Sequence, residues 1–194
     1  MKKPYSILID TYSHIVTPKY LEARRKIAPN VQGDIGTHGL YDLDLRFRVM
    51  DKFEGMVQVL TMDIPPVEDF GEHSADLARM ANDEMAELVT KYPDRFIAAI
   101  ASLPMNNTDA TLKEVDRAIN DLKFRGVLVY SNVNDKPLDS PEFMPLYEKM
   151  CQYNLPIFIH PHRDSDFSDY KTEKITQASA AKRSQSERFA TLEN

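Results

Sequence analysis

The sequence has a single cysteine, no long apolar run and no apolar leader, and each absence excludes a class of protein. With Cys151 as the one thiol, no intramolecular disulfide can form. The longest apolar stretches have the length of strands, far below the roughly 20 residues that a membrane helix needs. Because residues 1–4 lead directly into the first apolar stretch, we expect a cytoplasmic protein that does not contact a membrane.

Basic stripes and glycine-rich phosphate loops are also missing. The net charge is -6 and the charged residues are spread along the chain, so nucleic acid is not an expected partner. No Gly-x-Gly-x-x-Gly pattern follows an apolar run, which argues against a nucleotide-binding protein. At 194 residues the chain has the size of one domain but is shorter than a complete (β/α)₈ barrel of roughly 250 residues.

Five short apolar runs, rich in Val, Ile and Phe, predict strands that are buried on both faces, as in a parallel sheet. They span residues 6–10, 56–62, 96–103, 126–130 and 155–160. Between them apolar residues recur with helical spacing, in 43–53, 74–92, 112–122 and a stretch that begins at the N-cap Ser140. This alternation predicts an α/β protein with parallel strands. A doubly wound open sheet and a partial (β/α)₈ barrel both fit five strands.

The composition changes after Arg163. Large apolar residues become few in residues 164–194, where Ser, Lys, Asp and Glu dominate and only 177–194 has the pattern of a polar helix. We therefore divide the chain into a folded part, residues 1–163, and a polar C-terminal tail, residues 164–194.

Polar side chains follow the first and the last of the predicted strands. If the first strand stays extended, Asp10, Tyr12 and His14 project to one side, and the last strand ends with His160 and His162. The carboxyl ends of parallel strands meet at one edge of the sheet, where active sites form. Imidazole is a common ligand of zinc, iron and manganese, so His14 and His160 are candidate ligands of one ion. The alternative is that both are unrelated surface histidines.

Four passages of the chain resemble the amidohydrolase-2 group, which includes the aminocarboxymuconate-semialdehyde and dihydroxybenzoate decarboxylases. The passages are Ile9 through His14 with Pro18 and Tyr20, Arg46 to Asp51 leading to Gln58-Val59-Leu60, Ala81 through Phe96, and Leu155 through Pro161. The resemblance covers roughly residues 5–165. It implies that residues 1–163 form an incomplete TIM-type (β/α) barrel. It also implies a metal-dependent decarboxylase or hydrolase that acts on a small carboxylated ring or ring-fission compound.

The resemblance also assigns a metal site. In this family the first strand ends Asp-x-His-x-His and both histidines bind a divalent metal, which we expect to be Zn²⁺ or else Mn²⁺. His14 matches the second histidine and His160 matches the strand-five ligand, whereas Tyr12 occupies the first position. A neutral phenol, with an ordinary pKa near 10, is a poorer ligand than imidazole. The family's strand-six histidine and strand-eight aspartate have no counterpart, so no catalytic residue is identified.

The remaining candidates have ordinary alternatives. His38 lies in a glycine-containing loop where related enzymes bind substrate, and Asn132 follows the fourth strand, but a solvent-facing histidine and a turn residue explain them equally. We expect Arg46 to be a solvated helix residue and Cys151 to be a small buried one.

Three functional hypotheses follow. The first is a metal-dependent enzyme that binds a small carboxylate and is impaired by truncation. The second is a non-catalytic barrel fragment whose unpaired edge strands favour self-association. The third is a homo-oligomer in which a second chain completes the site.

Overall fold

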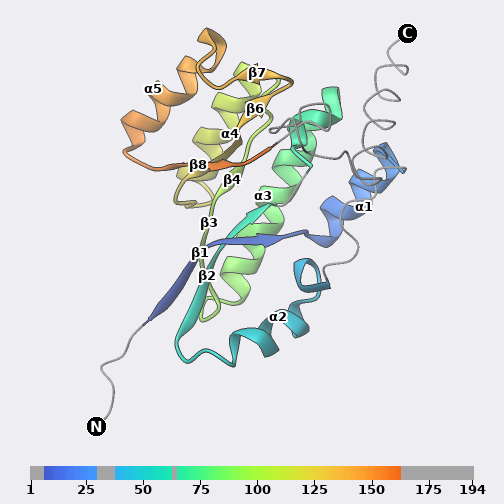
Figure 1. Cartoon of the computed structure of the whole chain (residues 1–194), viewed down its shortest axis with the longest axis vertical. Coiled ribbons are helices and arrows are strands. Elements are labelled where there is room, and N and C mark those ends of the chain that lie inside the picture. The colour runs from blue at the N-terminus through green and yellow to red at the C-terminus, as the bar shows by residue number, and fades with distance from the viewer. Residues whose placement is uncertain (1–6, 30–37, 63–64, 163–194) are drawn as a thin grey trace, which may run out of the picture.

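A computed structural model of the protein describes residues 7–29, 38–62 and 65–162, in which strands and helices alternate (Figure 1). The strands are β1 (Leu8–Ile15), β2 (Met56–Met62), β3 (Phe96–Ala99), β4 (Ala101–Ser102), β5 (Val127–Tyr130), β6 (Asn132–Val133), β7 (Lys136–Pro137) and β8 (Ile157–His160). The α-helices are α1 (Pro18–Ile27), α2 (Leu43–Met50), α3 (Ser74–Lys91), α4 (Thr108–Asn120) and α5 (Met144–Tyr153). Short 3-10 segments are η1 (His38–Leu40), η2 (Val67–His73) and η3 (Pro141–Phe143).

The strand order follows the order of the chain. β2 pairs in parallel with β1 and β3, and β5 pairs in parallel with β4 and β8. Only Ile100 separates β3 from β4, and its N–H donates to the carbonyl of Leu60 at 2.9 Å, so the two sets of strands are continuous. A doubly wound sheet reverses its strand order part-way, whereas a (β/α)₈ barrel does not. The fold is therefore a partial (β/α) barrel.

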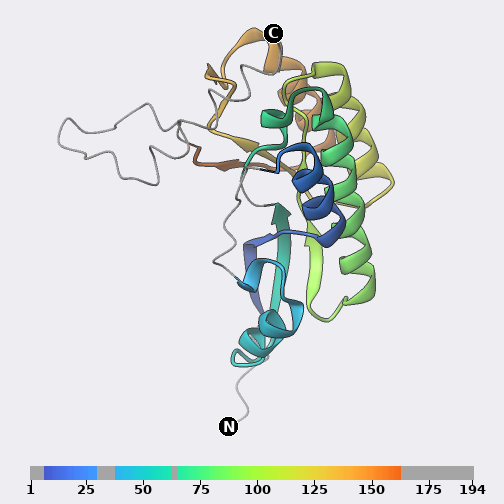
Figure 2. The same cartoon turned by 90° about the vertical axis from the view of Figure 1, so that its right-hand side faces the viewer.

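The helices pack on one face of the strands. Figure 2 shows α3, α4 and α5 side by side along that face. There, Leu60 and Met62 of β2 and Val127 and Val129 of β5 form the main core together with helix residues. Helix α3 supplies an apolar stripe that includes the buried Leu77, Ala81 and Met85, as its spacing predicts.

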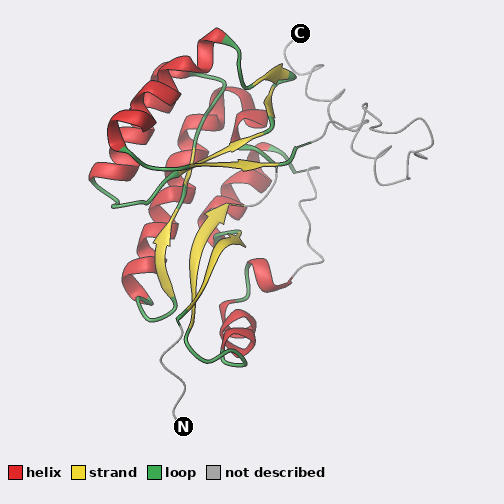
Figure 3. Cartoon of the chain, turned by 60° about the vertical axis from the view of Figure 1, so that its left-hand side comes forward, coloured by secondary structure: helices red, strands yellow, loops and turns green. Residues whose placement is uncertain are grey.

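The opposite face is the interior of the partial barrel. Its buried residues are Val59, Ala98, Ile100, Leu128 and Tyr130, against which Tyr12 and Phe158 pack. Tyr12 belongs to β1 and Phe158 to β8, the two ends of the strand order, yet their rings stack with centroids 5.9 Å apart. Figure 3 shows the second set of strands running at a steep angle to the first. The sheet therefore curls around this small core, as a closing barrel requires.

Several sequence-based expectations need correction. The first strand extends to Ile15, and the run at 96–103 is broken at Ile100, where the chain passes from one set of strands to the other. The β6–β7 pair was not expected. Cys151 is exposed, because α5 buries Leu146 and Met150 and the next residue along the helix falls outside that buried face. The predicted helix at 177–194 and the tail at 164–194 lie outside the described residues.

Within the described ranges, no helix combines the length and the apolar character that crossing a bilayer requires.

Gly126 directly precedes β5 and packs against Pro156, which directly precedes β8. A Cβ at this position would lie 2.7 Å from the carbonyl oxygen of Pro156 and 3.4 Å from Cδ1 of Ile100. We predict that Gly126→Ala lowers the free energy of unfolding by about 1–3 kcal/mol, because the added methyl group forces the two strands apart. Urea denaturation measures this change. Gly39→Ala is the control, since a Cβ there meets no atom within 4 Å; equal losses in both variants would contradict the close approach.

Candidate functional site

Two histidines from opposite ends of the strand order meet in the interior of the partial barrel. His14 lies near the carboxyl end of β1 and His160 is the last residue of β8. Their ring centroids are 5.0 Å apart and the ring planes are inclined at 47°. The curl of the sheet thus brings together the two side chains that the sequence nominates as metal ligands.

Both imidazoles have a backbone carbonyl beside Nδ1. The Nδ1 atom of His14 lies 3.1 Å from the carbonyl oxygen of Met62, and that of His160 lies 2.7 Å from the carbonyl oxygen of Pro161. A carbonyl oxygen only accepts hydrogen bonds, so each contact is a hydrogen bond in the tautomer that carries the proton on Nδ1. The lone pair of the neutral ring is then on Nε2. Histidines that bind metals characteristically donate their second N–H in this way.

The alternation expected for the first strand is interrupted. Between Asp10 and Ser13 the register of β1 against β2 slips by one residue, which is a β-bulge. The carboxylate of Asp10 accepts hydrogen bonds from the backbone N–H of Tyr12 at 3.3 Å and from Nε2 of Gln58 at 3.2 Å. Asp10 therefore binds the neighbouring strand, and the prediction that it projects beside His14 is wrong.

Arg46 fixes the backbone of β1 at this point. Its guanidinium is buried and donates to Oγ of Ser13 and to Oε1 of Gln58, both at 3.0 Å, and to the carbonyl oxygens of His14 and Gly39. Burial lowers the pKa of Arg46, while the negative charge of Asp10 opposes that shift. The expectation of a solvated helix arginine is wrong. The presence of Arg46 and Gln58 in the same family passage is the sequence signal that points to this contact.

Tyr12 packs among the rings of the site. Its ring lies edge-on to His14 with a centroid separation of 5.0 Å and stacks on Phe158. Burial raises the pKa of Tyr12, which keeps the phenol neutral. Its hydroxyl oxygen is buried, and no described residue offers it a hydrogen bond. The structure thus has an uncharged phenol at the position where the pattern Asp-x-His-x-His predicts an imidazole ligand.

The two weaker site candidates, His38 and Asn132, have described hydrogen-bond contacts with residues other than His14 and His160. His38 is exposed in η1, and its Nδ1 lies 3.2 Å from the hydroxyl of Tyr41. Asn132 begins β6, and its Nδ2 donates to the carbonyl of His162 at 3.1 Å, which anchors the chain just after β8. Among the residues that the structure describes, no group of three or more His, Cys, Asp or Glu side chains is arranged to hold a metal.

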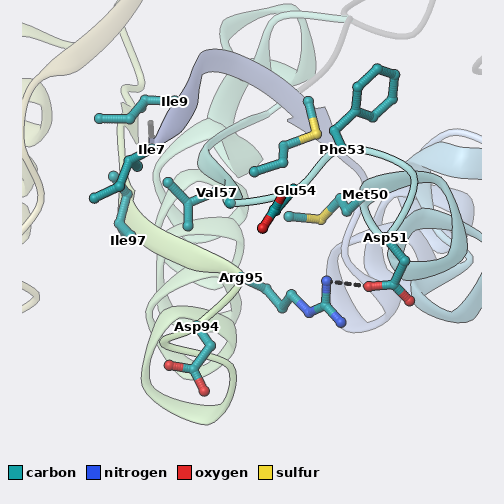
Figure 4. Close-up of a pocket in the computed structure, with 12 residues that line it drawn as sticks. Ile7, Ile9, Met50, Asp51, Phe53, Glu54, Val57, Asp94, Arg95 and Ile97 are labelled. Carbon is teal, nitrogen blue, oxygen red and sulfur yellow. Dashed lines mark ion pairs between the residues drawn. The ribbon is translucent and has the colours of Figure 1, made fainter. Parts of the chain in front are cut away.

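A cavity of about 470 Å³ lies at the other end of the strands (Figure 4). It is lined by Ile7, Ile9, Met50, Asp51, Phe53, Glu54, Gly55, Met56, Val57, Asp94, Arg95 and Ile97. Arg95 closes one side through an ion pair with Asp51 at 2.6 Å. Because Ile9, Val57 and Ile97 lie at the amino ends of β1, β2 and β3, this cavity is separate from the histidines at the carboxyl ends.

The fold and the position of the histidines agree with a comparison against known protein families. The family described as amidohydrolase matches residues 37–182. This chain belongs to the amidohydrolase family. The predicted resemblance to the amidohydrolase-2 decarboxylases is thereby confirmed.

The relatives of this amidohydrolase chain include several decarboxylases. The gamma-resorcylate decarboxylase of Rhizobium sp. (strain MTP-10005) is 32% identical over 157 residues, which cover 76% of this chain and 48% of that protein. The 2-amino-3-carboxymuconate-6-semialdehyde decarboxylase of Dictyostelium discoideum is 34% identical over 124 residues, covering 62% of this chain and 34% of that protein.

Among solved structures, a dihydroxybenzoic acid decarboxylase from Polaromonas sp. JS666, with bound manganese and the inhibitor 2-nitroresorcinol, superposes with a TM-score of 0.67. It is 25% identical, and the match covers 82% of this chain and 50% of that one. The amidohydrolase chain thus spans about a third to a half of the length of these relatives.

A buried carboxyl group, Glu68, lies in η2, the segment that follows β2 on the carboxyl side of the strands. It is 3% exposed, and its Oε1 atom has no hydrogen-bond partner among the described residues. Burial in this environment raises the pKa of Glu68 to about 8, helped by the negative charge of Asp69 and opposed by a backbone hydrogen bond. Sequence reasoning did not single out this residue, because nothing in the pattern distinguishes it from surface acids.

The raised pKa makes stability depend on pH. The folded state keeps the Glu68 proton up to about pH 8, whereas the unfolded chain loses it near the ordinary value of 4.5, so stability falls as the pH rises between these values. We predict that Glu68→Gln is the more stable protein at pH 8, by at least about 1 kcal/mol, and that the difference shrinks toward pH 5. Urea unfolding at both pH values tests this. Glu72→Gln, at an exposed position in η2, should show no such dependence; a pH-independent effect of Glu68→Gln would contradict the assignment.

Proposed function

We propose that this chain contributes two metal-binding histidines to a carboxy-lyase site for small carboxylated aromatic compounds. The observation that carries the proposal is the approach of His14 and His160 to a ring-centroid distance of 5.0 Å, each with Nδ1 beside a backbone carbonyl. The names of the matched relatives favour decarboxylation over hydrolysis. Because the match spans only about half of each relative, the activity of the whole enzyme is part of the proposal.

The donor set suits a divalent transition metal in part. Two neutral imidazoles are good ligands of Mn²⁺ and Zn²⁺, and the manganese in the Polaromonas relative favours Mn²⁺ over our first expectation of zinc. Metal sites of this kind usually have three or four protein ligands, so the residues that the structure describes supply an incomplete set. Once bound, the metal would polarise a substrate carboxylate or a bound water molecule.

The residues around the histidines favour a flat aromatic ligand. The rings of Tyr12 and Tyr130 lie beside His160, with centroid separations of 6.0 and 5.2 Å, and Phe158 stacks on Tyr12. Such an aromatic wall packs well against a planar ring and excludes water from one side of it. Substrate contacts from His38 or Asn132 are the weaker part of the proposal, because the described contacts of both residues lie away from the imidazole pair.

The proposal also includes a cytoplasmic location, a homo-oligomeric state and the division into a barrel part, residues 1–163, and a tail, residues 164–194. Exposed apolar side chains support self-association. Leu8 and Ile9 of β1 and Ile159 of β8 are 47%, 49% and 59% exposed, and these are the edge strands of the described sheet.

The first test is a metal titration of the full chain. We predict that the metal-free protein binds Mn²⁺ or Zn²⁺ in the micromolar range, and that His14→Ala and His160→Ala each weaken binding about tenfold or more, because each removes one ligand. Isothermal titration calorimetry measures the affinities. His73→Ala is the matched control, since that histidine is exposed at the end of η2. Metal binding that neither His14→Ala nor His160→Ala weakens would remove the basis of the proposal.

The second test introduces the imidazole that the pattern Asp-x-His-x-His predicts at position 12. We predict that Tyr12→His strengthens metal binding about tenfold or more, because a third nitrogen ligand joins His14 and His160 on the same face. Tyr12→Phe serves as control: it keeps the ring, removes the hydroxyl and adds no donor atom, so metal affinity should stay at the level of the unmodified chain. If Tyr12→His and Tyr12→Phe bind metal equally, position 12 does not face the ion.

A further inference from the structure

Thr61 lies directly beside His14 in the parallel pair of β1 and β2. The two residues are register partners, and Oγ1 of Thr61 lies 2.9 Å from Nδ1 of His14. Thr61 is fully buried, with 0% of its surface exposed. The hydroxyl group of a buried threonine needs a hydrogen-bond partner, and here the imidazole provides one.

The two oxygen atoms beside Nδ1 differ in what they can do. The carbonyl oxygen of Met62 only accepts, so it binds Nδ1 in the tautomer that carries the proton there; the hydroxyl of Thr61 accepts from Nδ1 in that same tautomer. The carbonyl contact is longer, at 3.1 Å, than the contact with Thr61 at 2.9 Å. Both oxygens belong to β2, so together they hold Nδ1 toward that strand and direct Nε2 away from it.

We propose that Thr61 is a positioning residue of the metal site: through the hydroxyl contact with Nδ1 it holds the ring of His14 in the orientation and tautomer in which Nε2 would bind the metal. Without the hydroxyl, only the longer contact with the carbonyl of Met62, at 3.1 Å, would oppose a half-turn of the ring that exchanges Nδ1 for a carbon atom. The consequence for metal binding rests on the proposed function, whereas the effect on the imidazole itself does not.

Thr61→Val is the informative change, because valine keeps the branched shape that suits a buried strand and replaces the hydroxyl with a methyl group. Thr61→Ser returns the hydroxyl with a smaller side chain. Thr111→Val is the matched control. Thr111 lies on α4, a helix on the other face of the strands, and is also buried, at 3% exposed. Its hydroxyl donates to the carbonyl oxygen of Pro104 at 2.8 Å.

The first measurement uses the metal-free full chain with ¹⁵N-labelled histidine, at a pH where the rings are neutral. Two-bond ¹H–¹⁵N correlation spectra distinguish the tautomers. We expect His14 to carry its proton on Nδ1 in the unmodified chain, in Thr61→Ser and in Thr111→Val, and to show the Nε2–H tautomer or a mixture in Thr61→Val. An unchanged His14 spectrum in Thr61→Val would overturn the proposal.

The second measurement is a Mn²⁺ titration of the same four proteins. We expect Thr61→Val to bind about tenfold more weakly, which is the scale of effect for a residue that orients a ligand, with Thr61→Ser close to the unmodified chain. A chain that binds no Mn²⁺ in any form refutes the proposed function, while the spectra still decide the role of Thr61. Should Thr61→Val not fold, Thr61→Ala takes its place in both measurements, and an Nδ1–H tautomer for His14 in that variant equally overturns the proposal.

Discussion

The buried guanidinium of Arg46 connects helix α2 by hydrogen bonds to β1, the strand that carries His14. It binds the side chains of Ser13 and Gln58 and the carbonyl oxygens of His14 and Gly39, and so joins α2, η1, β1 and β2 at one point. A buried cation costs several kcal/mol unless hydrogen bonds compensate for the lost hydration, and here five donors are directed at four acceptors. The position of His14 relative to β2, and hence its contacts with Thr61 and Met62, depends on this network.

Periodicity and composition predict much of the fold. The run at 56–62 becomes β2 with the same bounds, and the apolar stripe at 74–92 becomes α3. These predictions succeed because a strand buried on both faces and a long amphipathic helix leave strong patterns. Periodicity could not distinguish an open sheet from a barrel, because the difference depends on which strands are neighbours. The sequential strand order, and the contact between Tyr12 and Phe158, decide it.

The candidate site was predictable in part. His14 and His160 follow from their positions at strand ends and from the family passages, and the structure brings their rings together. Three features of the surroundings escaped prediction: the bulge in β1, the burial of Arg46 and the contact of Thr61 with His14. Each depends on a register or on a contact between distant residues, and neither leaves a local pattern. Tyr12 was recognised as a departure from the family, but its neutral, buried hydroxyl is a property of the surrounding core.

The bulge between Asp10 and Ser13 divides β1 into two halves, and the inward and outward alternation of side chains is shifted by one residue between them. Side chains alternate strictly along a strand, so the extra residue decides that His14 points into the barrel while Ile15 points to the helices. An in-frame loss of one codon here, such as that for Thr11, would leave composition and net charge almost unchanged. It would nevertheless turn the side chains of one half of the strand to the opposite face of the sheet. Either apolar side chains would become exposed, or the imidazole of His14 would point away from His160. In this short stretch, codon deletions are therefore far less tolerable than most single substitutions.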